Sequence, residues 1–386
     1  MTSTRPIWAE ISRSKLVHNY SLLRRLAGPQ TEVLAVVKAN AYGHGLAECA
    51  RVLESDGCRW FGVTCVEEGV ALRRALPEAG IVTLSGLCAQ DAAEVVEHRL
   101  TPVVWEPTHL HWLQTAAEKR GLRSGQLPVH LEIDTGMSRQ GVAPEHIEPL
   151  REHFRSESPL RLEALMTHFP SPEDREATHR QQLRLIAVAE AIHDRGIPFD
   201  ALSAGSSASM LQRDPADGLD MWAAKKGIRR IARAGIALYG YSPLTAPLQS
   251  ATGLKPVLSW KTRVVSLRTI EPGTAVGYDA TFTARRRTRL ALLPAGYADG
   301  LNRLLSNRGN VLVRGQRAPI AGRISMDHTV VDVTDIAGAE RGDEVILIGE
   351  QDGDRITADE LASLTGTIAY EVLCAISARV PRVMVD

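Results

Sequence analysis

Short runs of apolar, β-prone residues alternate with longer amphipathic stretches over the first two-thirds of the chain. Several of these runs are continuously apolar, which is typical of parallel strands that are buried on both faces. Helical patterns lie between them, for example in residues 91–97, 109–119 and 180–195. The alternation predicts eight strands, over residues 34–39, 60–64, 81–85, 102–105, 129–134, 162–168, 199–204 and 231–234.

Eight strand–helix repeats over roughly 240 residues match the size of a (β/α)8 barrel. The main alternative is a doubly wound open sheet, which binds dinucleotides through a GxGxxG motif after its first strand. No such motif follows the run at 34–39, and this weakens the alternative. We therefore predict an α/β protein whose N-terminal domain, residues 1–241, is a TIM-like (β/α)8 barrel.

The pattern changes after Tyr241. Residues 242–256 are rich in Pro, Ser, Thr and Gly and predict a linker. The pairing of Thr357 with Glu360 predicts the start of a short helix, because the two side chains form a capping box. We expect residues 242–386 to comprise this linker and a mainly β C-terminal domain. Its strand-like runs are 257–270, 289–294, 311–314, 324–333 and 344–348.

Charge is balanced along the chain, with 45 Lys and Arg residues against 45 Asp and Glu residues and no long block of one sign. This balance gives no electrostatic reason to expect nucleic acid or an anionic membrane as a partner. No apolar stretch reaches the about 18 residues of a membrane span, and the N-terminus lacks the apolar core of a secretory signal.

The five cysteines are odd in number and scattered, and none forms a CxxC pair. This spacing argues against a disulfide framework and against a zinc site. Buried, reduced thiols in a cytoplasmic protein are the simpler interpretation. We therefore expect a cytoplasmic protein without a metal, a nucleic-acid partner or a membrane partner.

Functional side chains of a (β/α)8 barrel lie at the C-terminal ends of its strands. Lys38 lies at the C-terminal end of the first predicted strand, 34–39. A single lysine in this position is most often a solvated strand end, because burying its cation is costly. In a desolvated barrel mouth, however, a lysine can become neutral and nucleophilic and form a Schiff base.

The loops after the seventh and eighth strands are rich in small residues, including Gly205, Ser206, Ser207 and Gly235. Small residues let backbone N–H groups approach a phosphate, and barrel enzymes often bind phosphate in these two loops. Each loop alone is weak evidence. Together with Lys38 they suggest a phosphorylated aldehyde cofactor, pyridoxal phosphate.

Several motifs are spread over nearly the whole chain. They are WAEI (8–11), VKANAYGHG (37–45), IDTGMSRQG (133–141), THF (167–169), ARAGIALYG (232–240), VGY (276–278), PAGYADG (294–300), GRISMD (322–327) and RVPR (379–382). These motifs and their order resemble those of the alanine racemases. The resemblance implies a barrel followed by a β domain, and a homodimer that shares its active site between subunits. It also implies interconversion of L-alanine and D-alanine.

The resemblance assigns the two catalytic bases. Lys38 would hold pyridoxal phosphate as an aldimine and act as one base, and Tyr278 of the partner subunit would act as the other. Two-base proton transfer needs one base on each face of the substrate. Since a free tyrosine has a pKa of about 10, the site must favour its phenolate. In similar enzymes a hydrogen-bonded chain through His168 to Arg233 has this role.

The resemblance also assigns binding residues. Arg233 would hydrogen-bond the pyridine nitrogen and keep it unprotonated, because a guanidinium is effectively never deprotonated. Arg139 would contact the cofactor and the substrate carboxylate, and the backbone N–H of Met326 would contact the same carboxylate. His168 would belong to the cofactor site. The positions that match the family's phosphate site are Tyr42, Ser207, Gly235, Ile236 and Tyr370.

One departure from the family pattern concerns the residue before Ile133. Many relatives carry a carbamylated lysine at this position, and this chain has Glu132. We hypothesise that Glu132 supplies the negative charge that orients Arg139. The alternative is that Glu132 points elsewhere. Asp279 and Ser325 stand where glycine and cysteine are frequent, which leaves the substrate range beyond alanine open.

Three alternatives to an alanine racemase remain. The first is a serine or broad-specificity amino-acid racemase on the same scaffold. The second is a non-catalytic pyridoxal-phosphate-binding protein, and the third is a decarboxylase with a similar barrel. Tyr278 and the C-terminal β domain argue against the second alternative. The sequence does not distinguish a biosynthetic from a catabolic role.

Overall fold

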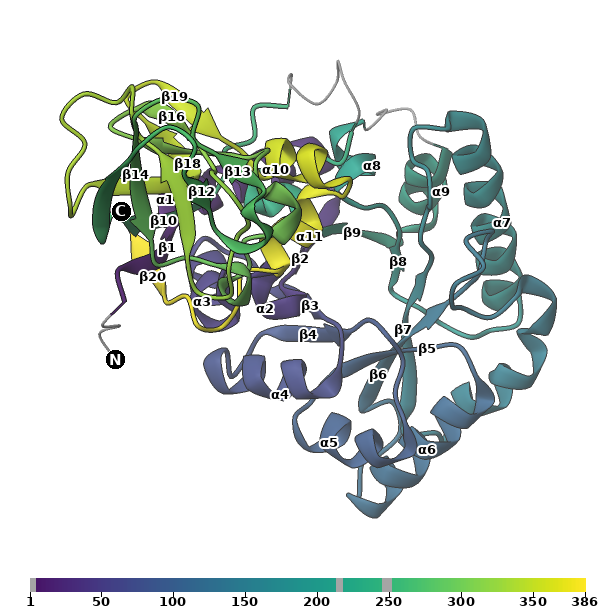
Figure 1. Ribbon diagram of the computed structural model, residues 1–386. Helices are drawn as coiled ribbons and strands as arrows, with labels where there is room; N and C mark the ends of the chain where they lie inside the picture. Colours follow the sequence, from purple (N-terminus) through teal and green to yellow (C-terminus); the bar gives the residue numbers. More distant parts are fainter. Residues whose placement is uncertain (1–4, 213–217, 245–251) are drawn as a thin grey trace. The chain divides into compact units, whose positions relative to one another are not determined.

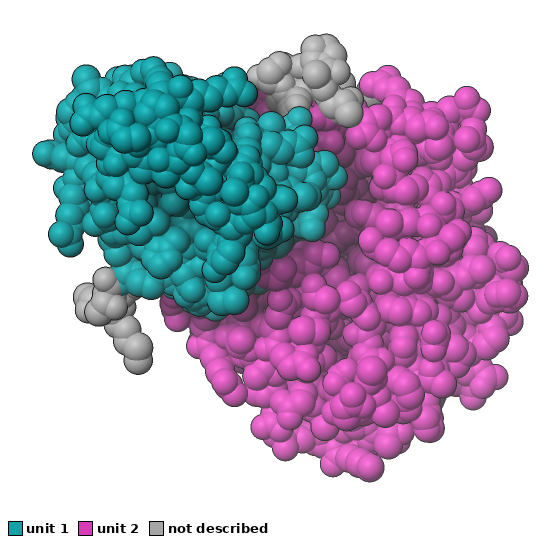
Figure 2. Space-filling view, in the orientation of Figure 1, with its two compact units in different colours: residues 1–15, 40–45, 256–386 teal, residues 16–39, 46–255 magenta. Residues whose placement is uncertain are grey.

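The computed structural model describes residues 5–212, 218–244 and 252–386. The chain forms two compact units, which Figure 2 shows in different colours. We call them the β unit and the barrel unit. The β unit comprises Met1–Lys15, Asn40–Gly45 and Pro256–Asp386, and the barrel unit comprises Leu16–Ala39 and Leu46–Lys255.

The barrel unit contains the predicted ring of eight parallel strands, and the ring is closed. Leu34 in the first barrel strand lies opposite Trp60 on one side and opposite Arg233 on the other, so the first and last strands pair. The fold class predicted from the sequence is confirmed. The strands are β2 (Thr31–Val36), β3 (Trp60–Val63), β4 (Gly80–Thr83), β5 (Thr101–Val104), β6 (Leu127–Glu132), β7 (Leu160–Met166), β8 (Ala201–Ser203) and β9 (Arg229–Ala234).

Helices follow the strands, and α4, α5, α6 and α7 lie outside the strand ring in Figure 1. In α6 the buried residues Leu110, Leu113 and Ala117 recur at a spacing of three and four, which places one apolar face toward the strands. The helices are α1 (Arg13–Ala27), α3 (Leu46–Ser55), α4 (Val66–Ala75), α5 (Ala92–Glu97), α6 (Pro107–Lys119), α7 (Arg175–Asp194), α8 (Ser207–Leu211) and α9 (Gly218–Lys226).

The β unit is mainly β, as predicted. Its largest sheet has the order β16-β15-β18-β10-β1-β20, with β19 paired to β18, and two smaller sheets are β11-β14-β17 and β12-β13. The strands are β1 (Ile7–Ser12), β10 (Leu258–Arg263), β11 (Ser266–Ile270), β12 (Ala275–Val276), β13 (Phe282–Thr283), β14 (Thr288–Leu293), β15 (Asn310–Val313), β16 (Gln316–Pro319), β17 (Thr329–Asp332), β18 (Glu344–Gln351), β19 (Asp354–Ile356) and β20 (Arg382–Val385).

The N-terminal segment does not belong to the barrel unit, contrary to the predicted domain of residues 1–241. Strand β1 pairs antiparallel with β10 and parallel with β20 in the β unit. Trp8 lies opposite Lys261, and Lys261 also forms an ion pair with Glu10 at 2.9 Å. Local sequence patterns cannot show this, because both partner strands lie more than 200 residues away.

The predicted strand 257–270 is two strands. Strand β10 pairs with β18, whereas β11 pairs with β14 in another sheet, so the chain changes sheets between Arg263 and Ser266. The predicted helix start at Thr357 is confirmed, since its Oγ1 accepts a hydrogen bond from the Glu360 N–H at 3.0 Å at the start of α10 (Ala358–Thr365). A second helix, α11 (Ala369–Cys374), follows.

The predicted linker, 242–256, lies partly outside the described residues, because 245–251 are not described. Its described parts contain no helix or strand. In the parts of the chain that the structure describes, no helix has the length and apolar content needed to cross a membrane, and no cluster of potential metal ligands occurs. Cys49 and Cys58 are buried, as expected, whereas Cys88 and Cys374 are exposed.

Candidate active site

Lys38 lies immediately beyond the end of the first barrel strand. Strand β2 ends at Val36, earlier than the predicted strand 34–39, and Lys38 is half-buried. The four residues after it, 39–42, all have φ between 52° and 55° and form a left-handed turn, α2 (Lys38–Tyr42). This conformation costs about 1–2 kcal/mol per non-glycine residue. Such strain persists only where surrounding contacts impose it, and it clusters at functional sites.

One carboxylate holds this turn on the barrel side. Glu68 in α4 accepts a hydrogen bond from the Ala39 N–H at 2.7 Å through Oε1 and from the Thr64 N–H at 2.8 Å through Oε2. The two oxygens of Glu68 therefore connect Ala39, the residue after Lys38, to Thr64, the residue after β3.

Three contacts within the β unit hold the end of the turn. The Arg382 Nε donates to the Gly43 carbonyl at 2.8 Å, and a Cβ on Gly43 would lie 2.3 Å from the Leu373 carbonyl oxygen. Burial lowers the pKa of His44 to about 4, so its ring is neutral near neutral pH. Its Nδ1–H then donates to the Tyr42 carbonyl at 2.9 Å.

Tyr42 and Tyr370, two residues expected at the phosphate, lie together in the β unit. Their ring centroids are 6.0 Å apart, with the planes inclined at 52°. Burial raises the pKa of Tyr42, so its hydroxyl stays protonated and is able to donate a hydrogen bond to an anion.

Arg233 on β9 is almost fully buried among acceptors from β7 and β8. Its Nη1 donates to the carbonyl and hydroxyl oxygens of Ser203 at 2.8 and 3.0 Å. Its Nη2 donates to the Thr167 carbonyl at 2.7 Å and to Nδ1 of His168 at 3.0 Å. Among the described residues, no acceptor binds Nε. Burial lowers the pKa of Arg233 to about 10, so the side chain remains a cation at neutral pH.

The contact with Arg233 fixes the protonation state of His168. Because a guanidinium only donates, Nδ1 of His168 must accept, and the ring proton lies on Nε2. Burial, followed by the charges of Arg233, Arg139 and Lys38, lowers the pKa of His168 to about 3. His168 is therefore neutral at neutral pH and carries a donor on Nε2.

The loops after β8 and β9 are joined by a hydroxyl. Ser207 Oγ accepts from the N–H groups of Gly235 at 2.9 Å and Ala237 at 3.3 Å. Ser207 begins α8 and Ile236 begins η4 (Ile236–Tyr239). The first N–H groups of a helix have no acceptor within the helix. Among the described residues, the N–H groups of Ser207 and Ile236 have no acceptor and, with the Ser207 hydroxyl, form a cradle of donors that fits a phosphate, whereas the Gly235 N–H is held by Ser207.

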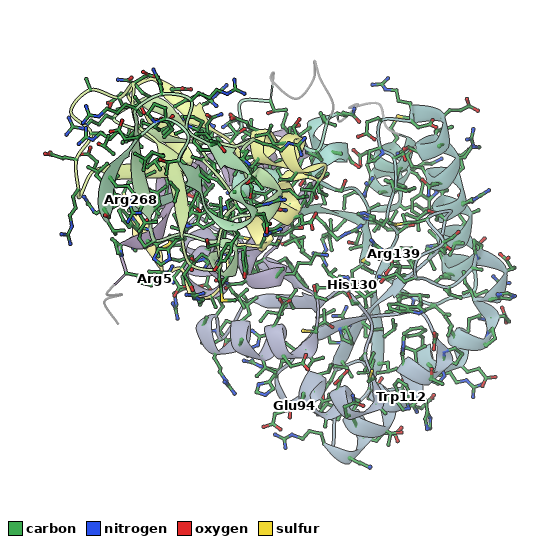
Figure 3. The ribbon with its side chains drawn as sticks, viewed as in Figure 1. Arg5, Glu94, Trp112, His130, Arg139 and Arg268 are labelled. Carbon is green, nitrogen blue, oxygen red and sulfur yellow. The ribbon has the colours of Figure 1, made fainter. Side chains whose placement is uncertain are left out.

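Glu132 forms no hydrogen bond or ion pair with Arg139 among the described residues, but the two charges interact, and the hypothesis that Glu132 orients this arginine stays a prediction. Glu132 is 2% exposed at the end of β6, and its Oε2 accepts from Gln140 Nε2 at 2.5 Å. The same Nε2 donates to the Leu84 carbonyl at 3.0 Å. Gln140 is half-buried, whereas its neighbour Arg139, which Figure 3 labels, is exposed. Burial raises the pKa of Glu132, and the charges of Arg233 and Arg139 oppose this rise.

The remaining expected residues are exposed on the β unit. The Tyr278 side chain is 67% exposed at the start of η6 (Tyr278–Ala280), and Met326 is 53% exposed. The residue after Tyr278, Asp279, has a φ of 57° and forms an ion pair with Arg323 at 3.6 Å. This pair links the tyrosine segment to the segment that contains Met326.

The sequence did not lead us to predict four residues whose contacts support the candidate site. Gln140 and Arg382 lie inside matched motifs, and so does Tyr239, whose hydroxyl donates to the Val36 carbonyl at 3.0 Å. Motif membership was therefore a usable signal for these three. No local signal indicates Glu68, because its role depends on the neighbouring positions of β2 and β3 in the barrel.

Comparison with known families agrees with this arrangement. The family model described as "Alanine racemase, N-terminal domain" matches residues 11–243, and "Alanine racemase, C-terminal domain" matches residues 257–384. The chain belongs to the alanine racemase family. Members of this family are pyridoxal-phosphate-dependent isomerases, which places the protein among enzymes of that class.

Individual family members match over almost their whole length. The alanine racemase of Halothermothrix orenii is 39% identical over 382 residues, which cover 98% of this chain and 97% of that protein. The enzyme of Sorangium cellulosum is 41% identical, with 98% of each chain covered. The solved alanine racemase of Clostridium difficile 630 has a TM-score of 0.90 at 30% identity, covering 99% of this chain and 96% of that chain.

Proposed function

We propose that the protein is an alanine racemase that interconverts L-alanine and D-alanine with pyridoxal phosphate. The observation that carries the proposal is the buried contact between Arg233 and His168. The charges of Lys38 and Arg139 also act on His168, so these four groups converge at one end of the barrel. Relatives named alanine racemase match the chain over nearly its full length.

The residues present fit the cofactor. Its aldehyde requires an amine, which Lys38 supplies, and its phosphate suits the cradle of donors on Ser207 and Ile236. Nε of Arg233 is a permanent donor that lacks an acceptor among the described residues and is suited to a pyridine nitrogen. Bound pyridoxal phosphate supplies an electron sink that makes the Cα proton of an amino acid acidic.

Two bases would then move the proton. Lys38 would act on one face of the substrate and Tyr278 on the other, so that one base removes the Cα proton of one enantiomer and the other base protonates the opposite face to give the other enantiomer. The Nε2–H of His168 is suited to stabilise a phenolate, and Arg233 fixes this tautomer through Nδ1. We propose that Tyr278 comes from the partner subunit, and its 67% exposure within its own chain supports this.

Substrate recognition would depend on the carboxylate. The exposed guanidinium of Arg139 and the backbone N–H of Met326 would bind it. We further propose a cytoplasmic homodimer that acts on a small-molecule amino acid and binds neither nucleic acid nor a membrane. The formal net charge of zero supports the last point.

The experiment that tests this function is chiral chromatography of purified protein incubated with pyridoxal phosphate and L-alanine, L-serine or L-lysine. We expect rapid D-alanine formation that disappears in a Lys38→Ala variant. Comparable turnover of serine or lysine would indicate a broad-specificity racemase. Release of carbon dioxide would indicate a decarboxylase. A protein that binds the cofactor and turns over no substrate would contradict the proposal.

A further inference from the structure

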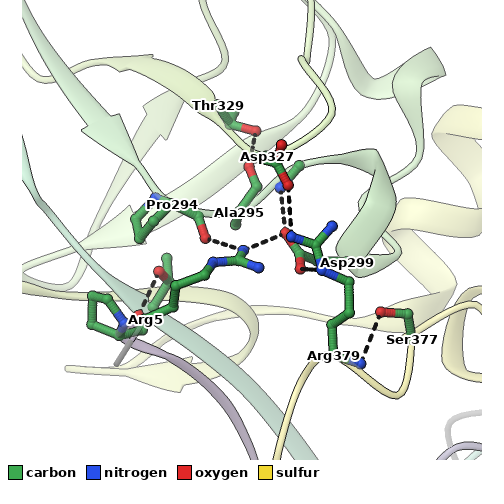
Figure 4. Close-up of polar contacts among 11 residues, drawn as sticks. Arg5, Pro294, Ala295, Asp299, Asp327, Thr329, Ser377 and Arg379 are labelled. Carbon is green, nitrogen blue, oxygen red and sulfur yellow. Dashed lines mark hydrogen bonds and ion pairs between the residues drawn. The ribbon is translucent and has the colours of Figure 1, made fainter. Parts of the chain in front are cut away.

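The fully buried carboxylate of Asp299 is held in place by hydrogen bonds within the β unit (Figure 4). Asp299 is 0% exposed, and its Oδ2 accepts from Arg5 Nη2 at 2.7 Å and from the Gly296 N–H at 3.0 Å. Arg5 also donates to the Pro294 carbonyl at 2.8 Å. A buried charge is stable only when it is paired and hydrogen-bonded. Asp299 therefore holds a defined position in the turn formed by residues 296–300.

Backbone hydrogen bonds join this turn to the segment that contains Met326. The N–H groups of Tyr297 and Ala298 donate to the carbonyls of Ser325 and Met326, each at 3.0 Å. Gly296 is packed so closely that a Cβ would lie 2.3 Å from the Met326 carbonyl oxygen. The Met326 carbonyl is thus occupied, whereas its N–H donates to no acceptor among the described residues.

A carboxylate follows this N–H directly in the sequence. Asp327 Oδ1 accepts from Arg379 Nη2 at 2.6 Å, and both side chains are 44% exposed. Nε of Arg379 lies 3.7 Å from Oδ1 of the buried Asp299 (Figure 4). The hydrogen bond from Arg379, with weaker contributions from the charges of Arg5 and His328, lowers the pKa of Asp327, which is therefore ionised at neutral pH.

We propose that Arg379 is a positioning residue that neutralises Asp327 and so keeps the Met326 N–H receptive to a substrate carboxylate. Asp299 holds Arg379 between the two acidic side chains. Without the guanidinium, the Asp327 charge would lie next to the incoming carboxylate and repel it. The inference rests on the proposed function, because the contact between Met326 and the substrate is itself part of that proposal.

The test is a double-mutant cycle on the pyridoxal-phosphate-loaded enzyme with Arg379→Ala, Asp327→Asn and the double variant. The measured quantities are kcat and KM for L-alanine and the inhibition constant of propionate, a carboxylate without an amino group. We expect Arg379→Ala to raise KM and the inhibition constant about threefold to fivefold with little change in kcat, since an exposed charge pair has a modest effect.

The double variant distinguishes neutralisation from a merely structural role. Once Asp327 carries no charge, loss of Arg379 has little further effect, so the double variant should recover nearly wild-type constants. Asp327→Asn alone and the charge-conserving Arg379→Lys should stay within about twofold of wild type. A double variant as impaired as Arg379→Ala would overturn the inference, and so would an unchanged KM in Arg379→Ala.

Arg286→Ala is the matched control, because Arg286 forms an exposed ion pair with Asp335 elsewhere in the β unit. It should leave both constants unchanged. These measurements distinguish a failure of the inference from a failure of the proposed function. A wild-type enzyme that binds propionate without racemising alanine contradicts the function, whereas an active enzyme in which Arg379→Ala changes nothing contradicts the inference alone.

Discussion

Glu132 shows how one buried charge affects a cluster of cations. It is 2% exposed, and its negative charge raises the pKa of Arg233 while burial lowers it. Replacement by glutamine keeps an acceptor for Gln140 but removes the charge. We therefore expect Glu132→Gln to reduce kcat/KM for alanine by about tenfold, because Arg233 and Arg139 lose a counter-charge. Steady-state kinetics with both enantiomers measure this effect.

Glu163→Gln is the matched control for this variant. Glu163 is also a buried carboxylate of the barrel, but it pairs with His130 at 3.2 Å and Arg161 at 3.0 Å and has no expected catalytic role. It should lower the free energy of unfolding and leave kcat/KM within about twofold of wild type. Unchanged kinetics in Glu132→Gln, or equal losses in both variants, would contradict the role given to Glu132.

The burial of His44 makes the free energy of unfolding sensitive to acid. Its pKa is about 4 in the folded protein, against about 6.5 in an unfolded chain. Between these values the unfolded chain binds a proton that the folded protein does not, so the free energy of unfolding falls as the pH decreases. We expect wild type to lose about 2 kcal/mol more than His44→Asn between pH 7 and pH 5.

Urea unfolding at the two pH values checks this prediction. Asparagine retains an N–H that is able to donate to the Tyr42 carbonyl, which makes it a suitable replacement. His168 also has a lowered pKa and acts equally in both proteins, so the difference between them reports His44 alone. Identical losses of stability in the two proteins would show that His44 does not contribute.

At the scale of elements, the left-handed turn after Lys38 depends on close packing at Gly43. This glycine has a φ of +83°, and an added Cβ would lie 2.3 Å from a backbone oxygen of Leu373. Gly342 has a similar φ of +96° with no atom within 4 Å of the Cβ position. Gly342→Ala therefore measures the backbone strain alone, and Gly43→Ala adds the clash.

We expect Gly342→Ala to lower the free energy of unfolding by about 1 kcal/mol and Gly43→Ala by about 3 kcal/mol or more. Gly43→Ala should also weaken retention of pyridoxal phosphate, because it displaces the turn that contains Tyr42. Urea unfolding and cofactor titration measure the two effects. Equal losses of stability in both variants would argue against a packing role for Gly43.

The strands show what a sequence pattern reveals and what it leaves out. All eight barrel strands were predicted from apolar runs, but several begin two or three residues earlier in the structure. In β2 and β9 the first residues, Thr31, Glu32 and Arg229, are polar and do not belong to the apolar run. The left-handed turn was missed because Val37, Lys38 and Ala39 continue the strand pattern, and side-chain polarity carries no information on the sign of φ.

Site residues were predicted through motifs rather than through periodicity. Chain position and residue type identified Lys38 and the small-residue loops, whereas every other role came from the resemblance. The partner of Glu132 could not be predicted, because which of the adjacent side chains, Arg139 or Gln140, turns inward depends on local backbone geometry. The same holds for Arg379, whose contact with Asp327 joins segments about 50 residues apart.

At the scale of the whole molecule, the candidate site residues are divided between two compact units. Lys38, Arg139, His168 and Arg233 belong to the barrel unit, whereas Tyr278 belongs to the β unit with Met326, Tyr42 and Tyr370. One chain supplies every residue type that the proposed reaction needs. The proposal that the two bases come from different copies therefore requires a test that separates the copies.

A purified heterodimer of one Lys38→Ala chain and one Tyr278→Phe chain provides that test. If each site combines Lys38 of one subunit with Tyr278 of the other, this heterodimer has one intact site and one doubly defective site. Co-expression with two different affinity tags isolates it from both homodimers. Racemisation of L-alanine is then followed by chiral chromatography. We predict about half the wild-type turnover per dimer, while each homodimeric variant is nearly inactive. An inactive heterodimer beside an active wild-type enzyme would contradict the shared two-base site.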